Sequence, residues 1–230
     1  MEDAVSAADE GALETKEADC ERAVVEALLV RARMPHAMTR RVALLTLADC
    51  ACNARIRGDN KCVQAFIDAL EDEDTLVKTA AVTSLRKVAL RSDERAVEAL
   101  SNTALHDTEW QTRKSAIEAL EAVALPGNEG VVEVFQELTR DKNSWIREAA
   151  VKALEILAPE ADPRSIATAS HTLHDSAWEV RRSAARTLMM LEPEGDGQDT
   201  VGPKVFGRED KSWFKMAEGY LRKPLFMPLR

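Results

Sequence analysis

Two histidine–aspartate dipeptides are the residues of this sequence best suited to metal binding or proton transfer, His106-Asp107 and His174-Asp175. An imidazole beside a carboxylate can ligate a metal ion or move a proton. His171 lies one helical turn before His174, so these two imidazoles can share a helix face. Two histidines without a third ligand make a weak metal site, and we therefore predict no metal and no other cofactor.

Four cysteines, Cys20, Cys50, Cys52 and Cys62, offer a second arrangement of metal-ligating groups. Cys50 and Cys52 are two positions apart within an expected helix, where their side chains diverge by about 200°. No histidine lies near them as a fourth ligand. We expect small packing residues in a reducing compartment.

Motifs for covalent or phosphate chemistry are absent from the sequence. It contains neither a glycine-rich phosphate loop nor a serine- or cysteine-centred nucleophile motif. Acidic residues are spread along the whole chain, so no particular pair of carboxylates stands out as a general acid and base. We therefore expect no catalytic residues and a protein that is not an enzyme.

A charged pair recurs four times, with a basic residue six positions after an aspartate: Asp72/Lys78, Asp107/Arg113, Asp141/Arg147 and Asp175/Arg181. An active site needs a set of catalytic side chains at only one place in a chain. A network of salt bridges and stabilised turns between repeats needs it in every copy. We therefore interpret these eight residues, the charged ladder, as structural.

The charged ladder belongs to a longer repeat, in which alanine and leucine follow each aspartate by nine and thirteen positions: Ala81, Ala116, Ala150, Ala184 and Leu85, Leu120, Leu154, Leu188. The aspartates at 72, 107, 141 and 175 are 35, 34 and 34 residues apart, and Arg40, Ala43 and Leu47 mark a weaker copy upstream. A fixed period of this length predicts stacked helical hairpins. The expected fold is an all-α, right-handed α-solenoid of about five hairpins.

Helix boundaries follow from the same register. Thr75, Thr108, Ser144 and Ser176 are the expected N-caps of the first helices, which should end before Pro126, Pro159 and Pro193. The second helices should cover residues 94–105, 128–139 and 163–173. Trp110, Trp145 and Trp178 fall at or beside the first-helix starts. We expect each indole to pack on a neighbouring layer, while a ligand-facing stripe at the edge of the solenoid stays open.

The repeat resembles the HEAT-like repeats of the phycobilisome-lyase type, over residues 36–192. The shared signature is an aspartate, a short gap, and an aliphatic–basic pair, here Val77-Lys78, Ile146-Arg147 and Val180-Arg181. The resemblance implies the architecture and a family of scaffolds, adaptors and a few enzymes. A lyase or metal-dependent enzyme subunit is therefore the alternative function, which the visible absorbance of a bound tetrapyrrole would reveal.

Composition divides the chain into four parts. Residues 1–17 are an acidic tail, 18–193 the solenoid, 194–203 a flexible linker, and 204–230 a basic, aromatic arm. The net charge is −9, and the arm carries seven basic residues against three acidic ones, so +4 lies in the arm and −13 before it. An acidic body disfavours nucleic acid as a partner except through residues 204–230.

The arm carries an apolar stripe at helical spacing. Trp213, Met216, Ala217, Tyr220 and Leu221 share one face of an expected short helix. We expect this arm to dock on a protein partner, while folding back onto the solenoid stays open. The expected contact residues are Phe206, Trp213, Phe214, Met216, Tyr220, Leu221 and Phe226, with Lys211, Lys215 and Arg222 at the rim.

The second helices should line a further binding face. Its expected residues are Arg95, Glu98, Asn102, Glu133, Gln136, Glu137, Arg164, Thr168 and His171. The predicted function is a non-catalytic scaffold or adaptor subunit that binds proteins within a larger assembly. The sequence has no apolar run of transmembrane length and no targeting segment at its start, so we expect an intracellular, cytoplasmic protein.

Overall fold

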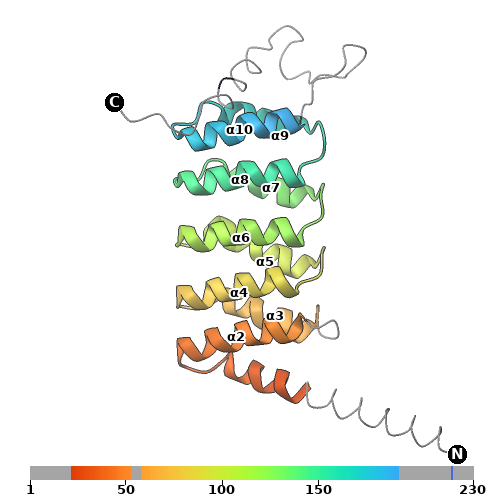
Figure 1. The fold of residues 1–230 in the computed structure, drawn as a ribbon, viewed down its shortest axis with the longest axis vertical. Helices are drawn as coiled ribbons and strands as arrows, with labels where there is room; N and C mark the ends of the chain where they lie inside the picture. Colours follow the sequence, from red (N-terminus) through yellow and green to blue (C-terminus); the bar gives the residue numbers. More distant parts are fainter. Residues whose placement is uncertain (1–21, 53–57, 192–218, 220–230) are drawn as a thin grey trace, which may run out of the picture. The chain divides into compact units, whose positions relative to one another are not determined.

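A computed structural model describes residues 22–52, 58–191 and 219 of the chain (Figure 1). Every regular element within these residues is helical. The chain divides into two compact units, Met1–Leu90 and Arg91–Arg230. The predicted acidic tail and linker, and all of the arm except Gly219, lie outside the described residues.

The first unit contains a helix over residues 22–31, α2 (Ala37–Ala51), α3 (Asn60–Asp68), the short 3-10 helix η1 (Ala69–Glu71) and α4 (Thr75–Val88). Helix α2 packs along α4, and α3 packs against both. Leu44, Leu47, Phe66 and Leu85 are fully buried between these helices. The weak upstream copy of the repeat therefore forms a hairpin like the others.

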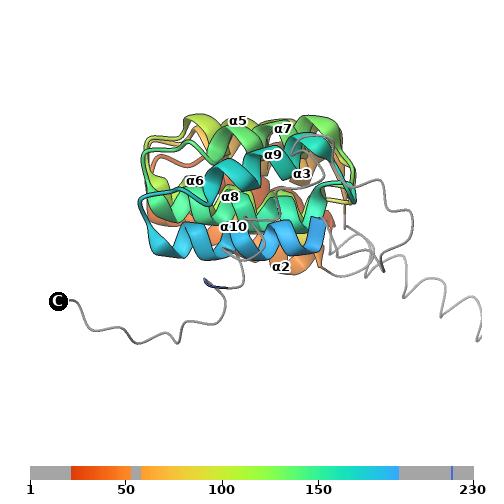
Figure 2. The same ribbon diagram turned by 90° about the horizontal axis from the view of Figure 1, so that it is seen from above.

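The second unit contains α5 (Glu94–His106), α6 (Trp110–Val123), α7 (Glu129–Leu138), α8 (Ser144–Leu157), α9 (Pro163–Thr172) and α10 (Trp178–Leu191). Figure 2 shows α6, α8 and α10 in one layer of this unit and α5, α7 and α9 in the other. The alanines and leucines of the repeat, such as Ala150 and Leu154, are fully buried. The all-α repeat solenoid predicted from the 34-residue register is confirmed.

The helix starts differ from the predicted caps by one residue. The N-cap of α4 is Asp74, whose carboxylate accepts from the backbone N–H of Leu76, and the N-cap of α8 is Asn143, whose amide oxygen accepts from the backbone N–H of Trp145. The predicted caps Thr75 and Ser144 are instead the first helical residues. Asp and Asn cap at least as well as Ser and Thr, so the polar residue one position earlier takes the role.

A row of backbone hydrogen bonds joins successive repeats where the first helices end. In each case a residue with positive φ donates its N–H to the carbonyl of the last residue of the next first-layer helix. These bonds are Gly58 to Val88 at 3.1 Å, Ser92 to Val123 at 2.9 Å, Gly127 to Leu157 at 2.8 Å, and Ala161 to Leu191 at 3.1 Å. We call the four donors the left-handed positions. They satisfy helix carbonyls that would otherwise lack partners.

Candidate functional site

The charged ladder bridges one repeat to the next. Arg147 donates from Nε and Nη2 to the two carboxylate oxygens of Asp175, both at 2.7 Å. Arg113 binds Asp141 in the same way at 3.1 Å, and Arg40 binds Asp72 at 2.7 and 2.8 Å. Forked pairing of a guanidinium with a carboxylate is among the strongest charge-assisted contacts.

Each of these arginines also closes its own loop. The Nη1 of Arg147 donates to the backbone carbonyls of Asp141 and Lys142 at 2.9 and 3.3 Å, and Nη1 of Arg181 donates to those of Asp175 and Ser176. An aspartate and arginine of one repeat therefore meet through the aspartate's backbone carbonyl. The carboxylate of that aspartate instead pairs with the arginine of the preceding repeat. Lys78 and Asp107 fall in different units.

Charge pairing keeps these groups ionised. Hydrogen bonds from Arg147 lower the pKa of Asp175 below its ordinary value, against the effect of burial. Burial raises the pKa of Asp72, but the hydrogen bonds from Arg40 and from the backbone N–H of Asp74 outweigh it, so that pKa is also lowered. The hydrogen bond to Asp175 raises the pKa of Arg147 in turn. A carboxylate held ionised and fully bonded suits a structural staple better than proton transfer.

The residues expected on the second helices lie on α5, α7 and α9, and we call their exposed side the second-helix face. Arg95, Glu98, Asn102, Glu133, Arg164 and His171 are exposed, and Gln136 is half-buried. Between α7 and α9, Gln136 Nε2 donates to Ser165 Oγ at 3.3 Å and Arg164 Nη1 donates to Glu133 Oε1 at 3.1 Å. Such an exposed ion pair contributes little stability, so both side chains can rearrange to bind a ligand.

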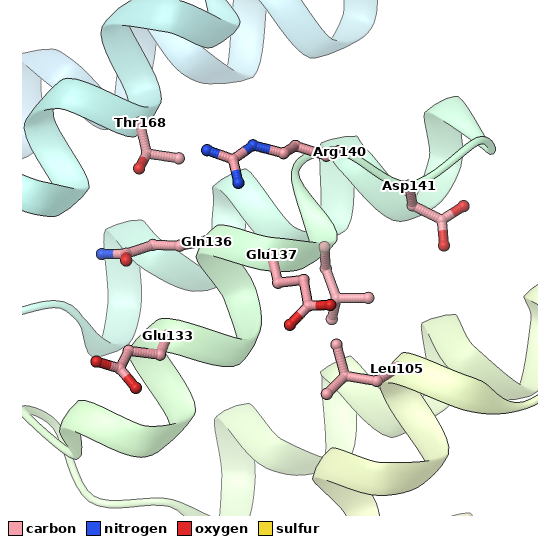
Figure 3. Close-up of a pocket in the computed structure, with 8 residues that line it drawn as sticks. Leu105, Glu133, Gln136, Glu137, Arg140, Asp141 and Thr168 are labelled. Carbon is pink, nitrogen blue, oxygen red and sulfur yellow. The ribbon is translucent and has the colours of Figure 1, made fainter.

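A groove of about 550 Å³ opens on this face. Its lining comes from α5, α7, α9 and the loop after α7: Leu105, Glu133, Gln136, Glu137, Leu138, Arg140, Asp141 and Thr168. In Figure 3, Glu133, Gln136 and Glu137 project from α7, and the guanidinium of Arg140 points toward the side of Thr168. Both carboxylate oxygens of Asp141 accept hydrogen bonds from Arg113, which leaves the exposed carboxylates of Glu133 and Glu137 against the one guanidinium of Arg140. The lining is therefore mildly negative.

A smaller pocket of about 380 Å³ shares Arg140, Asp141 and Thr168 with this groove. It brings together His171 and His174, and Asp175 lines it as well. Across the described part of the chain, no group of three or more His, Cys, Asp or Glu side chains is arranged to hold a metal ion. His106, the other predicted histidine, lines neither cavity.

Three of the packing expectations need correction. Cys62 is buried, and burial raises the pKa of its thiol to about 12, but Cys52 is exposed. Trp145 and Trp178 are 55% and 48% exposed, while Trp110 is half-buried. The expectation of buried packing is therefore wrong for Cys52, Trp145 and Trp178. Each lies at a helix terminus, where less of the surrounding surface is covered by neighbouring helices.

The predicted arm contacts lie outside the described residues and stay predictions. Among the helices that the structure describes, none combines the length and the apolar character needed to cross a bilayer.

A family model described as HEAT repeats matches residues 25–121 and 103–189. The model covers HEAT repeats in general, so the narrower phycobilisome-lyase type stays an expectation. No protein among the curated ones matches the chain.

Several solved structures share the fold. A designed armadillo repeat protein in complex with the peptide (KR)4 is 16% identical, with a TM-score of 0.54 over 85% of this chain and 97% of its own. YibA of Escherichia coli is 19% identical, with a TM-score of 0.52 over 79% of this chain and 65% of its own. An engineered protein is 23% identical, with a TM-score of 0.52 over 73% of this chain and 79% of its own. At these identities the likeness shows the fold alone.

Proposed function

The chain belongs to the HEAT-repeat family, and on that premise we propose that it is a non-catalytic scaffold or adaptor subunit that binds a protein partner through its second-helix face. HEAT solenoids generally serve protein interaction, because stacked repeats present an extended row of exposed side chains. Within the charged ladder, Arg113, Asp141, Arg147 and Asp175 are already engaged in joining repeats.

The groove on the second-helix face is the observation that carries this proposal. It runs beside α7, where Glu133 and Glu137 are both exposed, and it is bounded by α5 and α9. Leu105 and Leu138 add apolar surface to its lining. A row of carboxylates beside apolar surface complements an extended segment with alternating basic and aliphatic groups.

The proposed partner segment is therefore an extended, basic stretch of another protein. The designed armadillo protein that shares this fold is titled as a complex with the basic peptide (KR)4. That likeness concerns the fold, and the case for this chain comes from its own exposed Glu133 and Glu137. Arg140 at the groove's edge would repel a uniformly basic ligand there, which favours a segment whose charges are spaced.

Binding of a fluorescent octapeptide that alternates lysine with leucine to the full chain tests the proposal by anisotropy. The double variant Glu133→Lys/Glu137→Lys should bind at least roughly tenfold more weakly, since two attractions become repulsions. The matched control is Glu160→Lys, an exposed acid that lines neither cavity. No measurable binding to the unaltered chain, or equal loss in the control, would contradict the proposed groove.

A further inference from the structure

The smaller pocket of about 380 Å³, which we call the histidine pocket, brings together three exposed side chains that carry N–H donors: Arg140, His171 and His174. The two histidines lie one turn apart at the end of α9, where the backbone N–H of His174 donates to the carbonyl of His171 at 3.2 Å. Arg140 comes from the loop after α7. Two successive repeats therefore supply the three groups.

The acidic groups of the histidine pocket are already neutralised. Asp175 accepts two hydrogen bonds from Arg147 at 2.7 Å, and Asp141 accepts two from Arg113 at 3.1 Å. The remaining Nη1 of Arg147 donates to backbone carbonyls. The formal charge left over in the lining is that of Arg140, and each imidazole adds a further positive charge when it is protonated.

Hydroxyl and carbonyl groups around the histidine pocket are engaged as well. Its three threonine hydroxyls each donate to a backbone carbonyl. At the ends of α7 and α9, the carbonyls of Leu138 and Thr172 accept the backbone N–H groups of Asp141 and Asp175, both at 3.1 Å. Because these terminal carbonyls have partners, they oppose an anion less than unpaired ones would.

The donors of Arg140, His171 and His174, by contrast, are not used. Among the described residues, these three side chains form no hydrogen bond or ion pair. A guanidinium offers two parallel N–H groups to an anion, and each imidazole offers one. A phosphoryl group presents three acceptor oxygens and a charge of about −1.5 to −2 at neutral pH. It therefore matches this set of donors better than a carboxylate, which carries a single charge on two oxygens.

We propose that the histidine pocket binds a phosphoryl group carried by the partner segment. Its connection to that segment rests on the proposed function, because Arg140, Asp141 and Thr168 line the groove and the histidine pocket alike. Figure 3 shows the guanidinium of Arg140 pointing toward the side of Thr168. A segment whose basic side chains lie along Glu133 and Glu137 thus places a neighbouring phosphorylated residue over Arg140.

This arrangement makes the ligand bipolar, with cations over the glutamates of the groove and an anion over Arg140. The guanidinium that repels a uniformly basic segment then attracts the phosphorylated one. Phosphorylation of the partner therefore acts as a switch that strengthens binding, through new charge-assisted hydrogen bonds.

NMR of the histidine ring resonances of the full chain tests the histidine pocket by itself. The probe is N-acetyl-O-phosphoserine N-methylamide, which carries the phosphoryl group without flanking residues. It should shift the ring resonances of His171 and His174. The other two histidines of the chain, His36 and His106, are also exposed and line neither cavity, so they serve as internal controls and should not shift.

A charge-removing variant identifies the guanidinium. Arg140→Gln should weaken binding of the phosphoserine derivative at least roughly tenfold, since charge-assisted hydrogen bonds are lost. The matched control is Lys142→Gln, an exposed cation of the same loop that lines neither cavity, and it should bind like the unaltered chain. Equal shifts of all four histidines, no shifts at all, or the same loss in the control overturn the pocket.

Phosphopeptides test the connection to the groove. The alternating lysine–leucine octapeptide is extended by phosphoserine at its N-terminus or at its C-terminus, because either direction of the segment can place that residue over Arg140. One of the two should bind at least about tenfold more tightly than its unphosphorylated form, and Arg140→Gln should remove that gain. The absence of a gain in both peptides overturns the connection. Equal binding of a peptide with glutamate in place of phosphoserine overturns the preference for a phosphoryl group.

Failure of the groove and failure of the histidine pocket give different results. If the unphosphorylated octapeptide does not bind while the phosphoserine derivative still shifts His171 and His174, the groove is wrong and the pocket stands. If the octapeptide binds but phosphorylation adds nothing and the histidine resonances do not move, the pocket is wrong and the groove stands.

Discussion

The guanidinium of Arg147 holds both carboxylate oxygens of Asp175 at 2.7 Å, across the boundary between two repeats. Both side chains are mostly buried, with 14% and 12% of their surfaces exposed. The same guanidinium closes the loop that precedes its own helix. One arginine therefore fixes a loop within its repeat and the spacing to the next.

A double-mutant cycle on this pair should give a coupling free energy of about 1–3 kcal/mol. We expect Arg147→Met and Asp175→Asn each to lower the free energy of unfolding, because each leaves a partly buried charge without its partner. The double variant should lose less than the sum of the two. Chemical denaturation measures all four proteins. Strict additivity would show that the pair is not energetically coupled.

The Asp175 carboxylate should also make stability depend on pH in acid. Its pKa in the folded chain is lowered, chiefly by the hydrogen bonds from Arg147. The corresponding stabilisation is therefore fully present above the ordinary aspartate pKa, about 3.9, and is lost as pH falls through the lower folded value. The unfolding free energies of the unaltered chain and of Asp175→Asn should converge below about pH 4. A constant difference from pH 7 to pH 3 would contradict this assignment.

The register of the solenoid could be predicted from the sequence because burial alone determines it. Ala150 and Leu154 recur at the spacing that one helix face requires, and both are fully buried. The partner of Arg147 could not be chosen in the same way. An aspartate six residues before it and another 28 residues after it were equally compatible with the sequence. The backbone geometry of the loops selects the second.

Neither the groove nor the exposure of the tryptophans could be predicted from the sequence, for a different reason. The lining combines Leu105 from α5 with side chains from α7 and α9. Because these residues are far apart in the sequence, no local sequence pattern predicts the groove. Glu133 and Gln136 were expected on this face from helical spacing, but spacing could not show that they border a cavity. Trp145 sits at a helix start, where an indole can turn either toward the next layer or toward solvent.

Truncating a core leucine tests the register itself. Leu120 and Leu154 occupy equivalent positions in α6 and α8 and are both fully buried. Leu120→Ala and Leu154→Ala should each lower the free energy of unfolding by about 2–5 kcal/mol, through lost apolar burial and the cavity left behind. Leu125→Ala is the control, because this leucine is largely exposed. Thermal neutrality of both core variants would disprove the register.

At the left-handed positions, a substitution can raise the free energy of unfolding instead of lowering it. Ala161 has a φ of +58°, a conformation that costs an alanine roughly 1 kcal/mol and a glycine almost nothing. Ala161→Gly should therefore raise the free energy of unfolding by about 0.5–1 kcal/mol, while its N–H still binds the carbonyl of Leu191.

Gly127→Ala makes the matched test at an equivalent left-handed position, where φ is +81° and nothing lies within 4 Å of an added methyl group. With no steric clash, the change is purely conformational, and it should destabilise the chain by about 1 kcal/mol. Gly130→Ala, inside α7 and without a positive φ, is the control and should be neutral or stabilising. Thermal or chemical denaturation of the three variants measures the effect. If Ala161→Gly and Gly127→Ala change stability in the same direction, backbone conformation does not govern these positions.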